Sequence, residues 1–177
     1  MFIPLQKTIM TFFQELFSSV PADIWVFSAR YVPWIFLGVI LLFIMYTTVV
    51  GIIEKKDHFV QRVILTLSVT GVIAFFLQLV LKLTITHERP FLQGVYSFYE
   101  YGSLESFPSG HALVFMALAV AAFFLNRKIG SILLITAFII GFARMIVGIH
   151  WPIDIIAGWI LGYGTGRFGY ILFKKKR

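Results

Sequence analysis

Six ionisable residues in this sequence have the types and the spacing needed for chemistry on a phosphate group. They lie in two segments and are Lys82, Arg89, His111, Arg144, His150 and Asp154. Arginine offers a planar fork of donors for phosphate oxygens, and lysine offers a point charge. Histidine acts as a nucleophile or as a proton donor near neutral pH. Together these residues predict a phosphoryl-transfer site, provided that the fold brings them to one place.

The segment GIHWPID places a carboxylate close to a histidine. Pro152 suits the first turn of a helix, which puts Asp154 in that turn and near His150. A carboxylate bonded to one ring nitrogen fixes the tautomer and leaves the other nitrogen free to attack phosphorus. His111 is expected one turn into another helix, facing the same site, where it could be the acid.

The segment PSGH supplies backbone groups. Pro108 stops regular structure, Ser109 is a good N-cap, and Gly110 lets a ligand approach the chain. A helix that starts here points free N–H groups and its positive dipole end at an anion. An ordinary N-cap would explain the segment equally well when it is taken alone. Of the other two histidines, we interpret His58 as a packing or capping residue, and His87 fits either role.

The composition places these residues in a membrane protein. Of the 177 residues, 59% are hydrophobic and 13% are charged, and the mean hydropathy is +0.91. Soluble domains carry about 45–50% apolar and about 25% charged residues. The net charge of +7 is interpreted as an orientation signal and not as a nucleic-acid footprint. With no cysteine, disulfides and thiolate metal sites are excluded.

The apolar stretches predict an all-α polytopic membrane bundle of five to six transmembrane helices in a single domain, 1–177. The five clear stretches are 31–53, 60–83, 111–125, 129–149 and 153–173. Residues 1–20 have apolar positions at helical spacing and predict an amphipathic helix in the membrane interface. A sixth span is the alternative for this stretch. A signal peptide is disfavoured, because no basic segment precedes the apolar part and Glu15 interrupts it.

Lysine and arginine predict the orientation. They concentrate in the loops 54–62 and 126–128 and in the tail 174–177, which share one side if the five stretches alternate. That side is expected to be cytoplasmic, with the C-terminus on it. The stretch 86–111 and the junction 149–154 then meet at the outer, periplasmic face of the cytoplasmic membrane. This topology gathers the six ionisable residues into one layer.

A metal site is the main chemical alternative. Two histidines and one aspartate could hold zinc, but three cations would surround the ion, and there is no HExxH motif. The chain has only eight acidic residues, so Mg²⁺ would find few ligands. We therefore predict metal-independent chemistry with no cofactor.

Three motifs resemble those of the type-2 phosphatidic acid phosphatase superfamily, and of its bacterial members in particular. KLTITHERP fits K-x6-RP, PSGH fits the second motif, and ARMIVGIHWPID fits SR-x5-H-x3-D. The resemblance implies that His150 is the nucleophile and forms a phosphohistidine, that Asp154 orients it, and that His111 protonates the leaving lipid oxygen. It also implies a phosphate-binding set, namely Lys82, Arg89, Ser109, Gly110 and Arg144. Ala143 departs from the pattern, because the family has serine there.

The resemblance implies a lipid phosphate as substrate. Bacterial members act on undecaprenyl pyrophosphate, phosphatidylglycerol phosphate or lipid A 1-phosphate, and the motifs do not separate these. The loop 91–107 predicts either an interfacial aromatic belt or a lid over the lipid headgroup, through Tyr96, Phe98, Tyr99, Glu100, Tyr101 and Glu105. Two other functions stay open: a transporter that binds the anion without hydrolysis, and a scaffold with a degenerate site. No nucleic acid and no obligate protein partner are expected.

Overall fold

The structure is a computed structural model that describes residues 3–98 and 102–174. Within these ranges the regular elements are helices, as predicted, with one isolated bridge between Glu88 and Glu105. In chain order they are α1 (Ile3–Leu16), α2 (Ala22–Arg30), α3 (Val32–Ile53), α4 (Asp57–Thr84), the short 3₁₀ helix η1 (Pro90–Gln93), α5 (Gly110–Leu125), α6 (Arg127–Ile146) and α7 (Pro152–Leu172).

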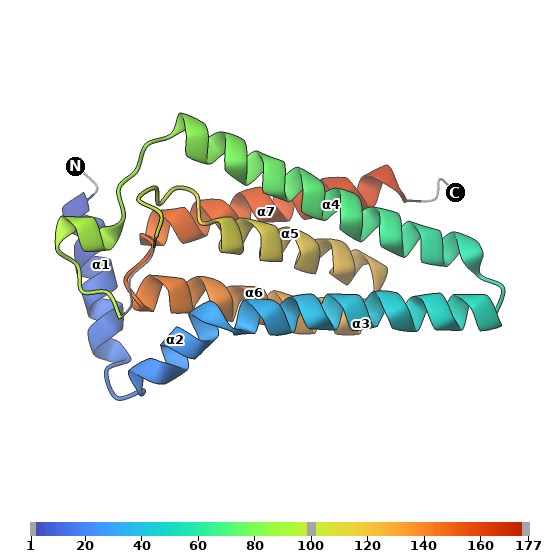
Figure 1. The fold of residues 1–177 in the computed structure, drawn as a ribbon, viewed down its shortest axis with the longest axis horizontal. Helices are drawn as coiled ribbons and strands as arrows, with labels where there is room; N and C mark the ends of the chain where they lie inside the picture. The colour runs from blue at the N-terminus through green and yellow to red at the C-terminus, as the bar shows by residue number, and fades with distance from the viewer. Residues whose placement is uncertain (1–2, 99–101, 175–177) are drawn as a thin grey trace.

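Helices α3 to α7 run side by side along the long axis of the molecule, and α1 lies across one end of them (Figure 1). The central helix is α5, which packs against α4, α6 and α7. Most of its side chains are buried, including the unbroken run 115–122. Because α5 is enclosed by protein, its 16 residues are apolar on all sides.

Glycines let α7 approach α5 closely. A Cβ atom at Gly162 would lie 2.4 Å from the carbonyl oxygen of Leu113, and one at Gly166 would lie 2.3 Å from that of Ala117. Small residues at helix contacts allow membrane helices to pack backbone to backbone. This contact holds the first turns of α5 and α7 side by side, and these turns carry His111 and Asp154.

The helices match the five predicted apolar stretches. The largest differences are of three residues, at the start of α4 and at the end of α6. Helix α6 stops at Ile146 because the chain turns at Val147 and Gly148, where the glycine has φ +85°. Three helices, α3, α4 and α6, are long and apolar enough to cross a membrane, and α5 is apolar but shorter. Helix α7 has 21 residues and carries Asp154 and Arg167. A count of five to six spans remains a prediction.

Helix α1 is bound to the rest of the protein by hydrogen bonds and by apolar packing. The Gln14 side chain donates to the carbonyl oxygens of Ile146, at 2.9 Å, and Tyr96, at 3.2 Å. The Lys7 ammonium group lies 3.4 Å from the carbonyl oxygen of Gln93. Met10 is fully buried in a cluster that includes Trp151. The predicted amphipathic helix therefore caps the bundle end that carries the histidines, and its position in the membrane interface remains a prediction.

Helix α2 was not among the predicted elements. It has Asp23 in its first turn and Arg30 in its last turn, and both charges suit the helix dipole. Its buried residue Ala29 packs beside Ala143 and Val147 at the end of α6. Helix α2 therefore closes the same end of the bundle from the side of α6.

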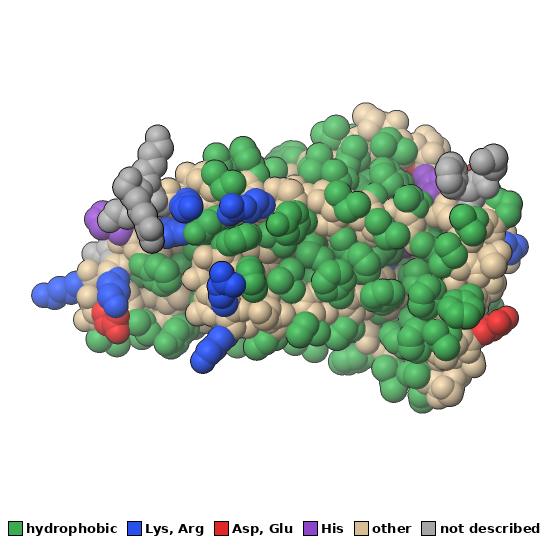
Figure 2. Space-filling view, turned by 180° about the vertical axis from the view of Figure 1, so that it is seen from behind, with side chains coloured by type: hydrophobic (Ala, Val, Ile, Leu, Met, Phe, Trp, Pro, Cys, Tyr) green, Lys and Arg blue, Asp and Glu red, His purple; other side chains and the backbone are tan. Residues whose placement is uncertain are grey.

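The surface divides into an apolar middle and charged ends. Figure 2 shows hydrophobic side chains over the middle of one face and lysines and arginines gathered at one end. The α3–α4 and α5–α6 connections and the end of α7 share that end, opposite α1 (Figure 1). The basic segments 54–62 and 126–128 and Lys174 therefore lie together, as predicted, while residues 175–177 lie outside the described ranges.

Candidate active site

The long connection between α4 and α5 is folded back on itself next to the histidines. The bridge between Glu88 and Glu105 pairs its two arms. The Ser106 amide donates to the carbonyl oxygen of His87 at 2.7 Å, and the His87 amide donates to the Glu105 carboxylate at 3.0 Å. These bonds bring Arg89 and Ser106, from opposite arms, towards the α6–α7 connection.

The start of α5 is joined to the start of α7. Ser109 is the N-cap of α5, and its hydroxyl accepts from the amide of Ala112 at 3.5 Å. The Ser109 amide donates to the main-chain carbonyl of Asp154 at 3.2 Å. The N-cap interpretation of PSGH is therefore confirmed, and the same serine also fixes α5 against α7.

The α6–α7 connection presents His150 to the site. Gly148 is needed there, because a Cβ atom at this left-handed position would lie 2.2 Å from the carbonyl oxygen of Tyr96. Pro152 begins α7, and the Asp154 carboxylate accepts from the Trp151 amide at 2.8 Å. A carboxylate at this position satisfies a helix N-terminus and complements its dipole. Asp154 therefore lies one turn after His150, as predicted.

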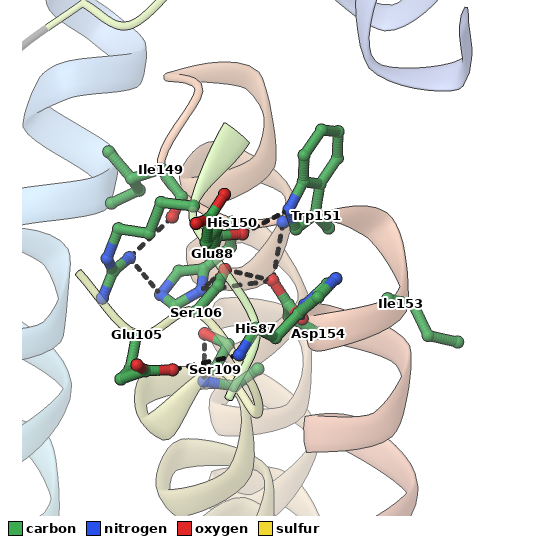
Figure 3. Close-up of polar contacts among 12 residues, drawn as sticks. His87, Glu88, Glu105, Ser106, Ser109, Ile149, His150, Trp151, Ile153 and Asp154 are labelled. Carbon is green, nitrogen blue, oxygen red and sulfur yellow. Dashed lines mark hydrogen bonds and ion pairs between the residues drawn. The ribbon is translucent and has the colours of Figure 1, made fainter. Parts of the chain in front are cut away.

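His150 is held between a cation on one side and a hydroxyl on the other. Its Nε2 atom lies 3.4 Å from Nη1 of Arg89, which also donates to the carbonyl oxygen of Ile149 at 2.6 Å. Its Nδ1 atom lies 3.3 Å from the Ser106 hydroxyl, and that hydroxyl donates to Oδ2 of Asp154. Figure 3 shows Ser106 between His150 and Asp154.

The distance between the Asp154 carboxylate and the His150 ring is longer than a hydrogen bond. Their Oδ2 and Nδ1 atoms are 3.7 Å apart, whereas an N–H···O bond spans about 2.7–3.2 Å. The carboxylate acts on the ring through its charge and through Ser106. Sequence reasoning missed Ser106, because a serine in a loop gives no signal by type or spacing.

Burial sets the protonation state of His150. The side chain is 2% exposed, and this burial lowers the pKa of His150 far below its usual value, with Arg144 and Arg89 acting in the same direction and Asp154 acting against them. The imidazole is therefore neutral near neutral pH. A neutral ring has a lone pair for nucleophilic attack.

A cavity of about 320 Å³ opens beside His150 between α4 and α5. Its polar lining consists of Gln78, Lys82, Gly110, His111 and His150, and its apolar lining consists of Phe75, Val114 and Phe115. Lys82 and His111 therefore share one cavity with His150, although they come from separate helices. Gln78 is a further polar residue at the cavity that the motifs did not indicate.

The two predicted arginines lie behind this cavity. Arg89 is fully buried, with its Nε atom donating to the carbonyl oxygen of Ser103. Arg144 is 2% exposed, and its Nη1 atom donates to the carbonyl oxygen of Ala29 at 3.0 Å. Both cations act electrostatically on His150. Arg89 reaches the nitrogen that faces away from Asp154, so it is the better placed of the two for a group bound there.

Two further expectations concern Ala143 and a metal site. Ala143 is fully buried and packs with Ala29, Val147 and Ile149, so an apolar cluster occupies the place expected for the serine. Among residues 3–98 and 102–174, no group of three or more His, Cys, Asp or Glu side chains is arranged to hold a metal ion. Metal independence remains a prediction.

The described part of the proposed lid is tied to the α6–α7 connection. The Phe98 amide and the Ser97 hydroxyl both donate to the carbonyl oxygen of Val147 at 3.1 Å. Tyr96 is largely exposed and packs edge-on against the Phe98 ring, with centroids 5.1 Å apart. Tyr99, Glu100 and Tyr101 lie outside the described residues. The Glu105 carboxylate accepts a hydrogen bond from the His87 amide.

The fold and the site define a helical membrane-type protein with paired histidines beside a basic cavity. A family model described as the PAP2 superfamily matches residues 62–177, more than half of the chain, and the protein belongs to this superfamily. The matched region contains all three motifs and all six ionisable residues.

Two of the relatives are named as undecaprenyl-diphosphatases. Another, 36% identical over 63 residues and covering 36% of this chain and 31% of the relative, is named as a bacitracin transport permease protein of Bacillus licheniformis. The chain is 37% identical over 105 residues to the undecaprenyl-diphosphatase of Sulfolobus acidocaldarius, covering 58% of this chain and 51% of the relative. It is 28% identical over 160 residues to the undecaprenyl-diphosphatase BcrC of Bacillus subtilis, covering 88% of this chain and 78% of that protein. In the first of these matches, the chain spans about half of the relative's length.

A solved structure supports the fold. The crystal structure of the first transmembrane PAP2 type phosphatidylglycerolphosphate phosphatase from Bacillus subtilis matches with a TM-score of 0.51 and 18% identity, covering 97% of this chain and 96% of that one. At this identity the similarity establishes the arrangement of helices alone.

Proposed function

We propose that this protein is a membrane lipid phosphatase that hydrolyses a phosphomonoester or pyrophosphate of a lipid through a phosphohistidine intermediate. The observation that carries the proposal is the buried His150 at a cavity that His111 and Lys82 also line, with Nη1 of Arg89 at 3.4 Å from its Nε2 atom. Membership of the PAP2 superfamily supports it.

In the first step, Nε2 of His150 attacks phosphorus in line with the bond to the leaving oxygen. The new N–P bond forms as that P–O bond breaks, and His111, which the step requires in its protonated form beside the phosphate anion, donates a proton to the departing oxygen and becomes neutral. Lys82 and Arg89 stabilise the charge on the equatorial oxygens, helped by Arg144 from behind and by Ser109 and the Gly110 amide at the start of α5. Asp154 stabilises the positive charge that develops on the imidazole.

In the second step, water attacks the phosphohistidine. His111, now neutral, accepts a proton from the water, which restores the starting protonation state. The N–P bond breaks, and inorganic phosphate leaves the cavity. The two steps together consume one water molecule and need no metal or other co-reactant, in accordance with the predicted metal-independent chemistry.

The proposed setting is the cytoplasmic membrane, with the site facing the periplasm and the C-terminus in the cytoplasm. The basic end opposite the site supports this orientation. Undecaprenyl pyrophosphate is the first candidate substrate, because the relatives from Sulfolobus acidocaldarius and Bacillus subtilis are named for it. Phosphatidylglycerol phosphate and lipid A 1-phosphate are the other candidates.

The test is phosphate release by the purified protein in detergent with excess chelator, using the three candidate lipids separately. We expect turnover of at least one lipid without added metal, and loss of that turnover in His150→Ala and in His111→Ala. His58→Ala is the matched control, because His58 is exposed and lies at the far end of α4. Lipid uptake into vesicles without phosphate release would instead support the transporter alternative.

A further inference from the structure

The two oxygens of the Asp154 carboxylate serve different histidines. Oδ2 accepts from Ser106 and from the Trp151 amide, on the side of His150. Oδ1 lies 3.0 Å from Nδ1 of His87, which comes from the connection after α4. Figure 3 shows His87 and His150 on either side of the aspartate. The contact with His87 is shorter than the 3.7 Å between Asp154 and His150.

The His87 ring is held in place by the same loop that positions Ser106. Its main chain accepts from the Ser106 amide and donates to the Glu105 carboxylate. Its ring lies between the rings of Phe107 and Trp151, with centroid distances of 6.4 Å and 6.3 Å. The contact with Asp154 therefore belongs to a fixed arrangement of the loop.

His87 has its own access to solvent. Its side chain is 26% exposed, compared with 2% for His150. It lines a groove of about 550 Å³ between α1, Phe107 and the start of α7, and His150 is not part of that lining. The exposed part of His87 therefore faces a different cavity from the one proposed to hold the substrate.

The charges around His87 come from three directions. Asp154 lies on α7, Glu105 lies on the second arm of the connection, and Glu88 is its neighbour in the chain. From α1, the groove receives the uncharged Gln6, while Lys7 is bonded to the carbonyl oxygen of Gln93. Across Asp154 lies the neutral His150, with Arg89 behind it. The charged groups nearest to His87 are thus carboxylates.

We propose that His87 is a titratable positioning residue for the hydrolysis. When His87 is neutral, the Asp154 carboxylate stabilises the positive charge that develops on His150. When His87 is protonated, it forms an ion pair with that carboxylate and slows nucleophilic attack by His150. This inference rests on the proposed function. The catalytic cycle needs the carboxylate charge because the imidazole becomes positive as it attacks phosphorus. A second cation on the same carboxylate weakens that stabilisation.

The direction of the titration can be stated. The hydrogen bond to Asp154 raises the pKa of His87 above its ordinary value, with burial opposing and the charges of Asp154 and Glu105 assisting. The His87–Asp154 ion pair therefore stabilises the fold fully below the pKa of an unfolded histidine, and this contribution is lost as pH rises through the raised pKa. Phosphatase activity is expected to change in the opposite direction from this stabilisation and to increase as pH rises through the same interval.

The test compares the wild-type protein with His87→Asn, which keeps a donor near the Nδ1 position but does not titrate. Turnover of undecaprenyl pyrophosphate in detergent is measured from about pH 5.5 to about pH 8.5, a range that spans histidine titration. We expect the wild-type kcat to fall about tenfold more than that of the variant at the acidic end. His58→Asn is the control and should keep the wild-type profile.

A second measurement separates this inference from the proposed function. The thermal unfolding midpoint is followed over the same pH range, and the wild-type advantage over His87→Asn should be larger at acidic than at alkaline pH. If wild-type protein releases no phosphate from any candidate lipid, the proposed function fails, and the inference falls with it even if the stability difference is present. If turnover is present but His87→Asn keeps the wild-type pH profile, as the His58→Asn control should, the inference about His87 is overturned. The inference is also overturned if folded His87→Asn is inactive at every pH.

Discussion

The arginine side chains at the two ends of the helical bundle have different surroundings. At the end covered by α1, Arg89 and Arg144 are almost completely buried and are bonded to carbonyl oxygens of residues distant in the chain. At the opposite end, arginines lie over aromatic rings: Arg167 is 4.5 Å from the centroid of Phe124, and Arg127 is 5.2 Å from that of Phe123. These rings come from α5, close by.

We expect the buried charges, and not the exposed ones, to act in the proposed reaction. Burial of a cation is costly unless its donors are satisfied. Arg89 donates to carbonyl oxygens of two connections, at Ser103 and Ile149, and Arg144 donates to that of Ala29 in α2. The arginines at the opposite end need no such carbonyl acceptors, because they remain partly in contact with solvent or headgroups. Substitutions at the two ends should therefore differ greatly in their effects on turnover.

The largest expected effect is at the nucleophile. His150→Ala removes the atom that we propose attacks phosphorus, and we expect kcat to fall by on the order of 10⁴-fold or more. The measurement is phosphate release from the lipid that the wild-type protein turns over. Activity close to wild type in folded His150→Ala protein would remove the proposed mechanism.

The comparison of the two ends is tested directly by Arg89→Lys and Arg167→Lys. Lysine keeps the charge but cannot reproduce the guanidinium contacts with Ile149 and His150, and we expect kcat/KM to fall by about 10²-fold in Arg89→Lys. Arg167→Lys should change kcat/KM by less than about twofold. Equal losses in the two variants would contradict the distinction between the two ends.

A smaller effect is expected at Ser106. Ser106→Ala removes the hydroxyl that donates to Asp154 beside Nδ1 of His150, and we expect kcat to fall by about tenfold with little change in KM. Ser28→Ala is the control, because the Ser28 hydroxyl bonds within α2 to the carbonyl oxygen of Ile24. An unchanged kcat in Ser106→Ala would mean that Asp154 acts on His150 without the serine.

The smallest effect is expected at the basic end, on stability alone. Arg127→Ala removes a cation that lies over the Phe123 ring, and exposed contacts of this kind contribute about 0.5–1 kcal/mol. Chemical unfolding in detergent micelles should detect a change of this size, while turnover stays at the wild-type level. A loss of turnover would show that this end of the bundle influences the site.

The sequence predicted the elements better than it predicted their contacts. The apolar stretches predicted α3 to α7, because long hydrophobic segments in a membrane form helices. The end of α6 was wrong by three residues, because a turn at Gly148 depends on the approach of the loop at Tyr96. Helix α2 was missed because it has only nine residues and packs against α6.

The same holds for the site: the sequence predicted which motif residues would meet better than it predicted the contacts between them. Alternation of the spans predicted that Lys82, His111 and His150 would meet, and they line one cavity. The order of contacts around Asp154 could not be predicted, because Ser106 and His87 reach it through pairing of the two arms of a loop. Such pairing depends on backbone hydrogen bonds, which leave no periodic pattern in the sequence.

The central claim is that His150 carries the phosphoryl group during turnover. Protein mixed with a lipid pyrophosphate labelled with ³²P at its terminal phosphate, then quenched within one turnover, should carry label that is lost in acid and retained in alkali. Peptide mapping should place that label on the segment containing His150, and His150→Ala should carry none. Turnover with no labelled protein, or label on a different residue, would contradict the account.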